Sequence, residues 1–251
     1  MPNPFDNVPL SDQAKAELAP TGVLRAGINM GNFLLVTGRT PEGDPDGVSP
    51  DMARAIAARL GVPLKLVPFR SPGELGDAVG TNVWDIGLIG AEPQRAEKIE
   101  FTPAYAEIEA TYLVPAGSTL QTVEEVDSAG VRIAVSARSA YGLWLERNIK
   151  QATIVRFDAG ENVFDTFVAD GLEAMAALRP GLIEDVKRLP GGRILDGHFA
   201  VVQQAVGTAK ANTAGAASLR AFVADAKASG FVERLIAKHQ VEGRLSVAAP
   251  A

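Results

Sequence analysis

Short apolar segments alternate with segments of helical periodicity along most of the chain, and this order predicts an α/β fold with largely parallel sheets. The first series of apolar segments that we interpret as strands lies at 23–29, 63–69, 84–90 and 107–114. A second series lies at 131–136, 153–157, 171–178 and 198–204. Helical patterns are present at 74–80, 139–150, 161–170, 214–229 and 231–240. The two series follow a similar order, which indicates two halves of similar architecture.

Two further helix starts are predicted from local signals. Ser49-Pro50-Asp51 has the order of an N-cap serine, a proline at the first helical position and an acid in the first turn. Gly61 lies where a glycine commonly ends such a helix. Thr122 and Glu125 have the spacing of a capping box.

Composition and motifs exclude several classes of function. The chain has 251 residues and a net charge of −6, with no run of lysine or arginine, so nucleic acid is not expected as a partner. It has no cysteine and two histidines, His198 and His239. It contains no phosphate-binding loop, no Ser-His-Asp order and no metal-ligand spacing. We therefore expect no metal, no cofactor and no catalytic residue.

The N-terminal segment MPNPFDNVPLSDQAKAELAP is polar and rich in proline. It lacks a basic start followed by an apolar core, so it is not expected to be a signal peptide. The sequence leaves two locations open, the periplasm if a leader was removed and the cytoplasm if Met1 is the native start. No apolar stretch approaches the roughly 18 residues that span a membrane.

The segment WDIGLIGAEPQRAEKIEFTPAYAEIEATYLV at 84–114 resembles the signature region of amino-acid-type solute-binding proteins of ABC importers, family 3. GVSPDMARAIAARLGVPLKLVPF and RIAVSARSAYGLWLE resemble other segments of the same family. The resemblance implies a type II periplasmic-binding-protein fold with two lobes and two crossing hinge strands, near 107–114 and 193–202. Lobe 1 would comprise 1–110 and 201–251, and lobe 2 would comprise 111–200.

The resemblance also implies a ligand site in a cleft between the lobes. In the family a Thr-x-x-Arg segment holds a carboxylate, because a guanidinium offers it two parallel hydrogen bonds. Here Arg95 is kept, Glu92 replaces the threonine, and Gly90 ends the preceding strand. The loop is also about two residues shorter than the usual pattern. The alternative is that Arg95 pairs with Glu92 or Glu97 on the surface.

The family's second anion-binding turn corresponds to Arg138-Ser139-Ala140, where Ser139 also suits a plain helix cap. Residues beyond the first strand are further candidates, since ligands bind at the carboxyl ends of parallel strands. These are Asn29, Asn32 and Phe33, which can equally be loop or core residues.

One departure from the family concerns the ligand's charge. Family members that bind amino acids place an Asp after the strand matching GLEAMAAL, whereas this chain has Leu178-Arg179-Pro180 and no carboxylate until Glu184. We therefore expect a carboxylated ligand other than an ordinary α-amino acid, with Arg179 as a further contact or as a solvated residue at the start of a helix.

The predicted function is reversible binding of a small carboxylated solute by a monomer that serves an ABC transporter permease. One alternative is a cofactor-free dehydratase of the cyclohexadienyl dehydratase type, with a general acid among Glu92, Glu107, Glu109 and Glu173. Carboxylates near hinge strands are more commonly structural ion-pair partners. The other alternative is a cytoplasmic sensor with the same fold.

Overall fold

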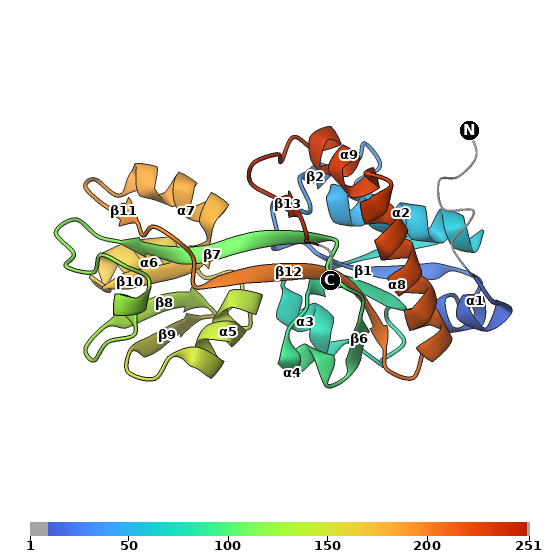
Figure 1. Ribbon diagram of the computed structural model, residues 1–251, viewed down its shortest axis with the longest axis horizontal. Helices are drawn as coiled ribbons and strands as arrows, with labels where there is room; N and C mark the ends of the chain where they lie inside the picture. The colour runs from blue at the N-terminus through green and yellow to red at the C-terminus, as the bar shows by residue number, and fades with distance from the viewer. Residues whose placement is uncertain (1–9, 250–251) are drawn as a thin grey trace. The chain divides into compact units, whose positions relative to one another are not determined.

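The computed structural model describes residues 10–249 and divides the chain into two compact units. Unit 1 runs to Glu107 and resumes at Gln203, and unit 2 comprises Ile108–Val202 (Figure 1). Residues 1–9, part of the segment expected not to be a signal peptide, lie outside the described range. Among the described residues, the helices are too short or too polar to cross a lipid bilayer.

The sheet of unit 1 has the strand order β4-β1-β5-β12. β1 pairs in parallel with both β4 and β5, whereas β12 is antiparallel to β5 and also pairs with β6. These strands are β1 (Leu24–Asn29), β4 (Leu64–Phe69), β5 (Ile86–Gly90), β6 (Ile99–Phe101) and β12 (Ala200–Ala209). A small hairpin joins β2 (Gly38–Arg39) to β3 (Pro45–Asp46). The carboxyl ends of β1, β4 and β5 therefore meet at one edge.

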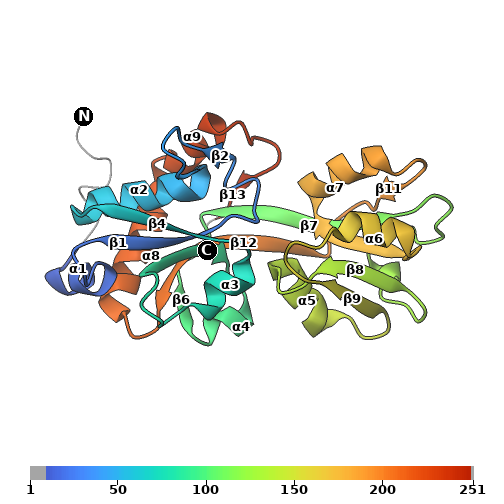
Figure 2. The ribbon, with the colours of Figure 1, turned by 180° about the vertical axis from the view of Figure 1, so that it is seen from behind.

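Helices cover the sheet of unit 1, as the view from behind shows for α2 and α3 (Figure 2). They are α1 (Asp12–Leu18), α2 (Val48–Leu60), α3 (Pro72–Asp77), α4 (Pro93–Ala96), α8 (Thr213–Ala228) and α9 (Phe231–Lys238). The sequence analysis did not predict α1. Ser11 caps it, and Leu18 packs against Gly215 of α8, where an added Cβ would lie 2.8 Å from a Leu18 methyl carbon. This contact with a distant helix stabilises an element whose local signals are weak.

The sheet of unit 2 has the strand order β7-β10-β8-β9. β8 pairs in parallel with β9 and β10, and β7 is antiparallel to β10. The strands are β7 (Ala106–Val114), β8 (Arg132–Ser136), β9 (Thr153–Phe157) and β10 (Ala174–Leu178), and the short β11 (Arg193–Ile194) pairs with β7. The short β13 (Ser246–Val247) belongs to unit 1 and pairs with the first two residues of β7, which also belong to unit 1. The helices are α5 (Ala140–Asn148), α6 (Val163–Ala169) and α7 (Arg179–Asp185), with 3₁₀ turns η1 (Glu124–Val126) and η2 (Val186–Arg188).

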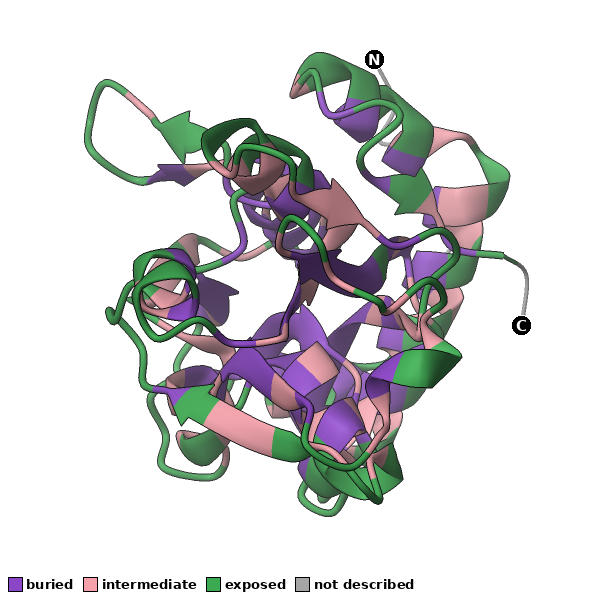
Figure 3. Cartoon of the chain, turned by 90° about the vertical axis from the view of Figure 1, so that its left-hand side faces the viewer, coloured by how far each residue is buried: buried purple, intermediate pink, exposed green. Residues whose placement is uncertain are grey.

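Side-chain alternation along the strands builds two cores in unit 2. On β8, Ile133 and Val135 face one core, which includes Leu145 of α5. Ala134, between them, faces the other core, which includes Phe167 of α6 and Leu182 of α7. Successive side chains of a strand point to opposite faces, so both faces of this sheet are covered and buried. Figure 3 shows the buried residues concentrated on strands and the exposed ones on outer helix faces and loops.

β7 and β12 each contain residues of both units. The second of these strands begins at Ala200 and not near residue 193 as expected. The reason is Gly197, whose φ of +74° turns the backbone between β11 and β12.

Two predicted helix starts are wrong in detail. α2 begins at Val48, after Gly47, and not at an N-cap Ser49. The hydroxyl of Ser49 is buried and lies 2.9 Å from the hydroxyl of Tyr105. This side chain, which the local sequence predicted as a helix cap, therefore makes a tertiary contact instead. Thr122 and Glu125 form only half of a capping box, in which the Glu125 carboxylate accepts from the Thr122 amide at 3.4 Å beside a single 3₁₀ turn.

Candidate ligand-binding site

The carboxyl-end edge of the unit 1 sheet brings together two groups of predicted site residues. β1 and β5 are adjacent and parallel, with Ile28 opposite Leu88, so Asn29 and Gly90 end their strands at the same edge. The Asn29 side-chain oxygen accepts from the amide of Gly31 at 3.1 Å, and the loop that follows continues to Asn32. Neighbouring strand ends thus place segments more than 60 residues apart beside each other.

Asn32 and Phe33 have different surroundings. Asn32 is buried, and its side-chain oxygen accepts from the amides of Leu34 at 3.1 Å and Leu35 at 3.3 Å, which fixes the loop. Phe33 is 46% exposed, so it is not an ordinary core residue. It lines a cavity of about 470 Å³ together with Thr37 and residues of the C-terminal segment, among them His239 and Arg244.

Arg95 is held inside unit 1. It lies on the short helix α4, which begins after Glu92 with Pro93 at its first position. Its side chain is buried, its Nη1 donates to the carbonyl of Gly90 at 2.7 Å, and its aliphatic part lies against Gly76. The alternative expectation placed Arg95 on the surface, paired with Glu92 or Glu97, and its burial contradicts the surface placement. A buried guanidinium at the carboxyl end of β5 suits recognition of a carboxylate.

Gly87 explains how α3 approaches β5 closely. A Cβ added at Gly87 would lie 2.8 Å from a methyl carbon of Leu75 on α3. The indole nitrogen of Trp84 donates to the carbonyl of Leu75 at 3.0 Å, which ties the start of the WDIGLIG segment to the same helix. This packing determines the position of β5 and hence of the segment that carries Arg95.

The side chain of His239, which follows the last residue of α9, is buried. Its side chain is 5% exposed, and its Nε2 lies 2.8 Å from Oδ2 of Asp51 on α2. Lys238 and Arg54 also donate to the Asp51 carboxylate, at 2.7 and 2.8 Å. Burial raises the pKa of Asp51, but the hydrogen bonds from Lys238, His239 and Arg54 outweigh this and hold the pKa below its ordinary value.

Asp46, Asp51 and His239 place their ligand atoms within 4.8 Å of one another, as a metal site would. The sequence analysis missed this group because its members are distant along the chain. However, three cationic or hydrogen-bonding side chains already donate to Asp51. The donor set therefore fits a network of ion pairs better than a resident metal ion.

In unit 2, the turn between β8 and α5 carries three of the predicted residues. Ser139 is the N-cap of α5, where its hydroxyl oxygen accepts from the amide of Gly142 at 3.0 Å and donates to the carbonyl of Ser136 at 2.7 Å. Arg138 has a φ of +58°, in the left-handed region, and Ala140 is buried as the first helical residue. The structural role of Ser139 is thus a cap, as the sequence also allowed.

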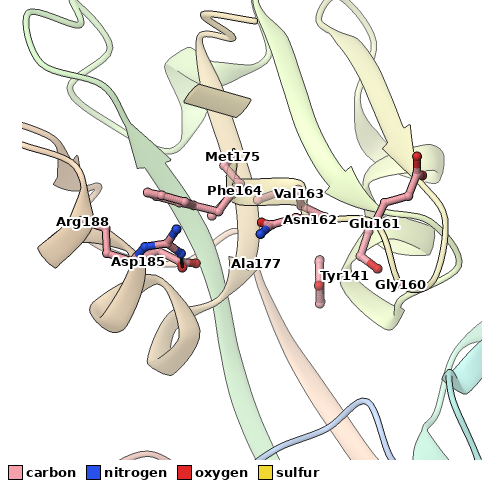
Figure 4. Close-up of a pocket in the computed structure, with 12 residues that line it drawn as sticks. Tyr141, Gly160, Glu161, Asn162, Val163, Phe164, Met175, Ala177, Asp185 and Arg188 are labelled. Carbon is pink, nitrogen blue, oxygen red and sulfur yellow. Dashed lines mark ion pairs between the residues drawn. The ribbon is translucent and has the colours of Figure 1, made fainter. Parts of the chain in front are cut away.

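A pocket of about 420 Å³ opens beside this turn, at the carboxyl ends of β8 and β10 (Figure 4). Ser136 and Tyr141 form part of its wall, and α6 contributes Phe164. The 3₁₀ turn after α7 contributes Arg188, and Asp185 is the last residue of α7 itself. Burial raises the pKa of Tyr141, and hydrogen bonds with Ser139 and Ser136 oppose this rise. The volume lies within the range of small-molecule pockets.

Arg179 begins α7 and is paired within unit 2. Its Nε donates to Glu109 on β7 at 2.7 Å, and it also donates to the carbonyl of Gly197. The other oxygen of Glu109 lies 3.4 Å from Nδ1 of His198. Arg179 is therefore neither simply solvated nor without a counter-ion.

The remaining acids proposed for a dehydratase also have structural partners. Glu173 accepts from the amide and guanidinium of Arg132, the first residue of β8, at 2.8–2.9 Å. This pair lies at the amino ends of β8 and β10, opposite to the pocket, and it holds the pKa of Glu173 below its ordinary value. Glu107 accepts from the side-chain amide of Gln203 at 3.2 Å. Glu92 is buried at the N-cap position of α4, where its side chain makes no capping hydrogen bond.

Asp185 and Tyr141 are among the pocket residues that the sequence analysis missed. Asp185 stands directly after Glu184, the first acid noted beyond the strand. A helical position one residue further along lies on a different face, rotated by about 100°. The helical pattern beyond β10 was the signal that could have separated these two acids.

The α/β units, the connecting strands and the strand-end residues together define a two-lobe periplasmic-binding-protein fold of type II. The chain belongs to the bacterial extracellular solute-binding proteins, family 3, whose family model matches residues 29–242.

Several known proteins are similar to the chain. A cyclohexadienyl dehydratase from Pseudomonas aeruginosa is 27% identical over 166 residues, which cover 61% of this chain and 61% of that enzyme. The crystal structure of a mutant of ArgBP from T. maritima has the same fold, with 22% sequence identity and a TM-score of 0.72; the match covers 91% of this chain and 100% of that one. A putative ABC transporter binding component from Wolinella succinogenes, crystallised with lysine, also has this fold. Its sequence identity is 20% and its TM-score 0.72, and the match covers 89% of this chain and 97% of that one.

Proposed function

We propose that the protein reversibly binds a small carboxylated solute and serves as the substrate-binding component of an amino-acid-type ABC transporter. Membership of solute-binding family 3 supports this proposal. Among structural relatives of the same fold, one is described as bound to L-arginine and another as complexed with lysine. On this proposal the protein acts outside the cytoplasm, as a monomer, and contacts a permease.

The observation that carries the proposal is the placement of Arg95. The side chain is buried at the carboxyl end of β5, and its contacts with Gly90 and Gly76 fix its direction. A preorganised guanidinium loses less conformational entropy when it binds a carboxylate than a mobile one would. We therefore assign the ligand's carboxylate to Arg95.

A dehydratase is the second candidate, and the match to cyclohexadienyl dehydratase supports it. The partners of Glu107, Glu109 and Glu173 favour binding without catalysis. Glu173 lies at the wrong end of its strand, and Glu109 is occupied by Arg179. Carboxylates that form such ion pairs are typically structural, whereas a general acid must hold a proton within hydrogen-bonding distance of the substrate.

The test is a thermal-shift screen of the full chain with amino acids, their 2-oxo acids, prephenate and arogenate. A ligand that binds only the native state raises the melting temperature by mass action. We expect a rise with at least one carboxylated solute and no turnover of prephenate or arogenate. A screen without any rise would contradict the binding function, and turnover would establish the dehydratase instead.

A further inference from the structure

An apolar pocket of about 450 Å³ lies within unit 1, between the second half of α8, the chain just before β7, and the end of β13. All its lining residues except Lys227 have apolar side chains. Val223 and Ala248 are buried there, whereas Ala224 and Ala228 are exposed, so the pocket is open to solvent on one side. Its volume lies within the range of small-molecule pockets.

The sequence of α8 explains why a pocket is left at this place. Ala224 and Ala228 are one helical turn apart and therefore lie on one face of the helix, where their methyl groups leave space that larger side chains would fill. The opposite wall is held by the backbone, because the amide of Ala248 donates to the carbonyl of Tyr105 at 3.2 Å. Such a pocket is largely formed before any ligand binds.

Lys227 supplies one positive charge to this apolar surface. Its half-buried side chain donates from Nζ to the carbonyls of Ala104 at 3.2 Å and Ala249 at 2.7 Å. An ammonium has three N–H donors, so these two neutral acceptors leave one donor for a ligand. Within residues 10–249, no carboxylate lies within ion-pair distance of this ammonium. The charge of Lys227 is therefore held in place by the backbone without being compensated.

We propose that this pocket binds a small amphipathic carboxylate, a straight-chain fatty acid, with its carboxylate on Lys227 and its chain against α8 and β13. A single fixed cation beside an otherwise apolar surface is complementary to a ligand with one negative group at the end of an apolar chain. The pocket shares no lining residue with the segment that carries Arg95, so this site is additional to the proposed solute site.

The test is calorimetric titration of the full chain with octanoate and with 1-octanol, which has the same chain length and no charge. The parent should bind octanoate at least fivefold more tightly than 1-octanol. Lys227→Met should weaken octanoate binding at least tenfold and change 1-octanol binding less than twofold, and Lys227→Arg should restore part of the loss. The matched control is Lys65→Met, since Lys65 is an exposed lysine of β4 outside the pocket, and this variant should bind octanoate as the parent does.

A second variant tests the apolar part of the pocket. Ala224→Phe places a ring in the space beside α8 and should weaken binding of both probes at least tenfold. The melting temperature without ligand checks that each variant is folded. Because Ala224 is exposed on the helix, Ala224→Phe decides the test if Lys227→Met does not fold.

Three results would overturn the inference. The first is a parent protein that does not bind octanoate, and the second is equal octanoate affinity of Lys227→Met and the parent. The third is loss of octanoate binding in Arg95→Ala with full binding in Lys227→Met, which would place octanoate in the proposed solute site and leave the proposed function standing. Octanoate binding that Arg95→Ala changes less than twofold and Lys227→Met abolishes is the expected result.

Discussion

Arg179 and Glu109 form an ion pair across unit 2, with 2.7 Å between Nε of Arg179 and Oε2 of Glu109. The pair joins the first residue of α7 to β7, and Arg179 also donates to the carbonyl of Gly197. The arginine that the sequence offered as a possible attraction for acidic ligands thus has a carboxylate partner of its own. The positive charge of Arg179 is therefore largely compensated within the protein.

This ion pair should contribute little to stability, because the side chain of Glu109 is 47% exposed. A double-mutant cycle of Glu109→Gln and Arg179→Met, measured by urea denaturation, should give a coupling energy below about 1 kcal/mol. A coupling of several kcal/mol would mean that the pair is shielded from solvent far more than its exposure indicates.

Replacing Arg95 should reduce affinity strongly. We expect Arg95→Ala to weaken binding of a carboxylated solute by about 2–5 kcal/mol, since a buried charged partner would be lost. Calorimetry measures the change. Arg220→Ala is the matched control, because Arg220 forms a half-exposed surface pair with Glu100 on the same unit, and its affinity should equal that of the parent. Unchanged affinity of Arg95→Ala would remove Arg95 from the site.

The Asp51 network should make stability depend on pH in acid. The pKa of Asp51 is lowered below its ordinary value of 3.8 in the folded protein, so its contribution is fully present above that value and is lost as the pH falls through the folded pKa. Asp51→Asn should therefore cost about 1–3 kcal/mol of unfolding free energy at pH 7. The difference from the parent should shrink below about pH 3.8.

Urea denaturation at pH 7 and pH 3 measures this dependence. Asp46→Asn is the control, because Asp46 is 38% exposed and lies 3.6 Å from Arg54, so its effect should be small at both values. A cost of Asp51→Asn that is the same at pH 3 as at pH 7 would show that the charge of Asp51 is not what stabilises the network.

Gly47 should tolerate no side chain. Its φ is +149°, and an added Cβ would lie 2.3 Å from the carbonyl oxygen of Leu35. Gly47→Ala should destabilise the protein by about 3 kcal/mol or more, from backbone strain and steric overlap together. Gly43→Ala is the comparison, since Gly43 also has positive φ but open space around it, and it should cost about 1–2 kcal/mol. Thermal or urea unfolding would distinguish the two, and equal costs would show that α2 shifts to accept the methyl group.

Chelation should have no effect. Because Arg54, Lys238 and His239 already donate to Asp51, we expect EDTA to leave both the melting temperature and solute binding unchanged. The measurement is thermal unfolding and calorimetry before and after dialysis against the chelator, with elemental analysis of the protein. A stoichiometric metal that is lost together with stability would identify Asp46, Asp51 and His239 as its ligands.

Sequence patterns alone determined the α/β class, most strands and the placement of Arg95 after a buried strand. These features depend on local periodicity and on residue order, which strand and helix geometry translate directly into structure. They also predicted Ser139 as a helix cap, because a cap needs only the amides of the next few residues.

Only the tertiary structure decided the partners of the charged side chains. His239 contacts Asp51, 188 residues away in the sequence, and Arg179 contacts Glu109, 70 residues away. A local sequence pattern therefore predicts neither pair. The same holds for Asp185, whose place in the wall of the unit 2 pocket depends on which face of α7 lies toward the ends of β8 and β10. Charge compensation acts through space between elements that packing brings together, and the order of residues along the chain does not specify it.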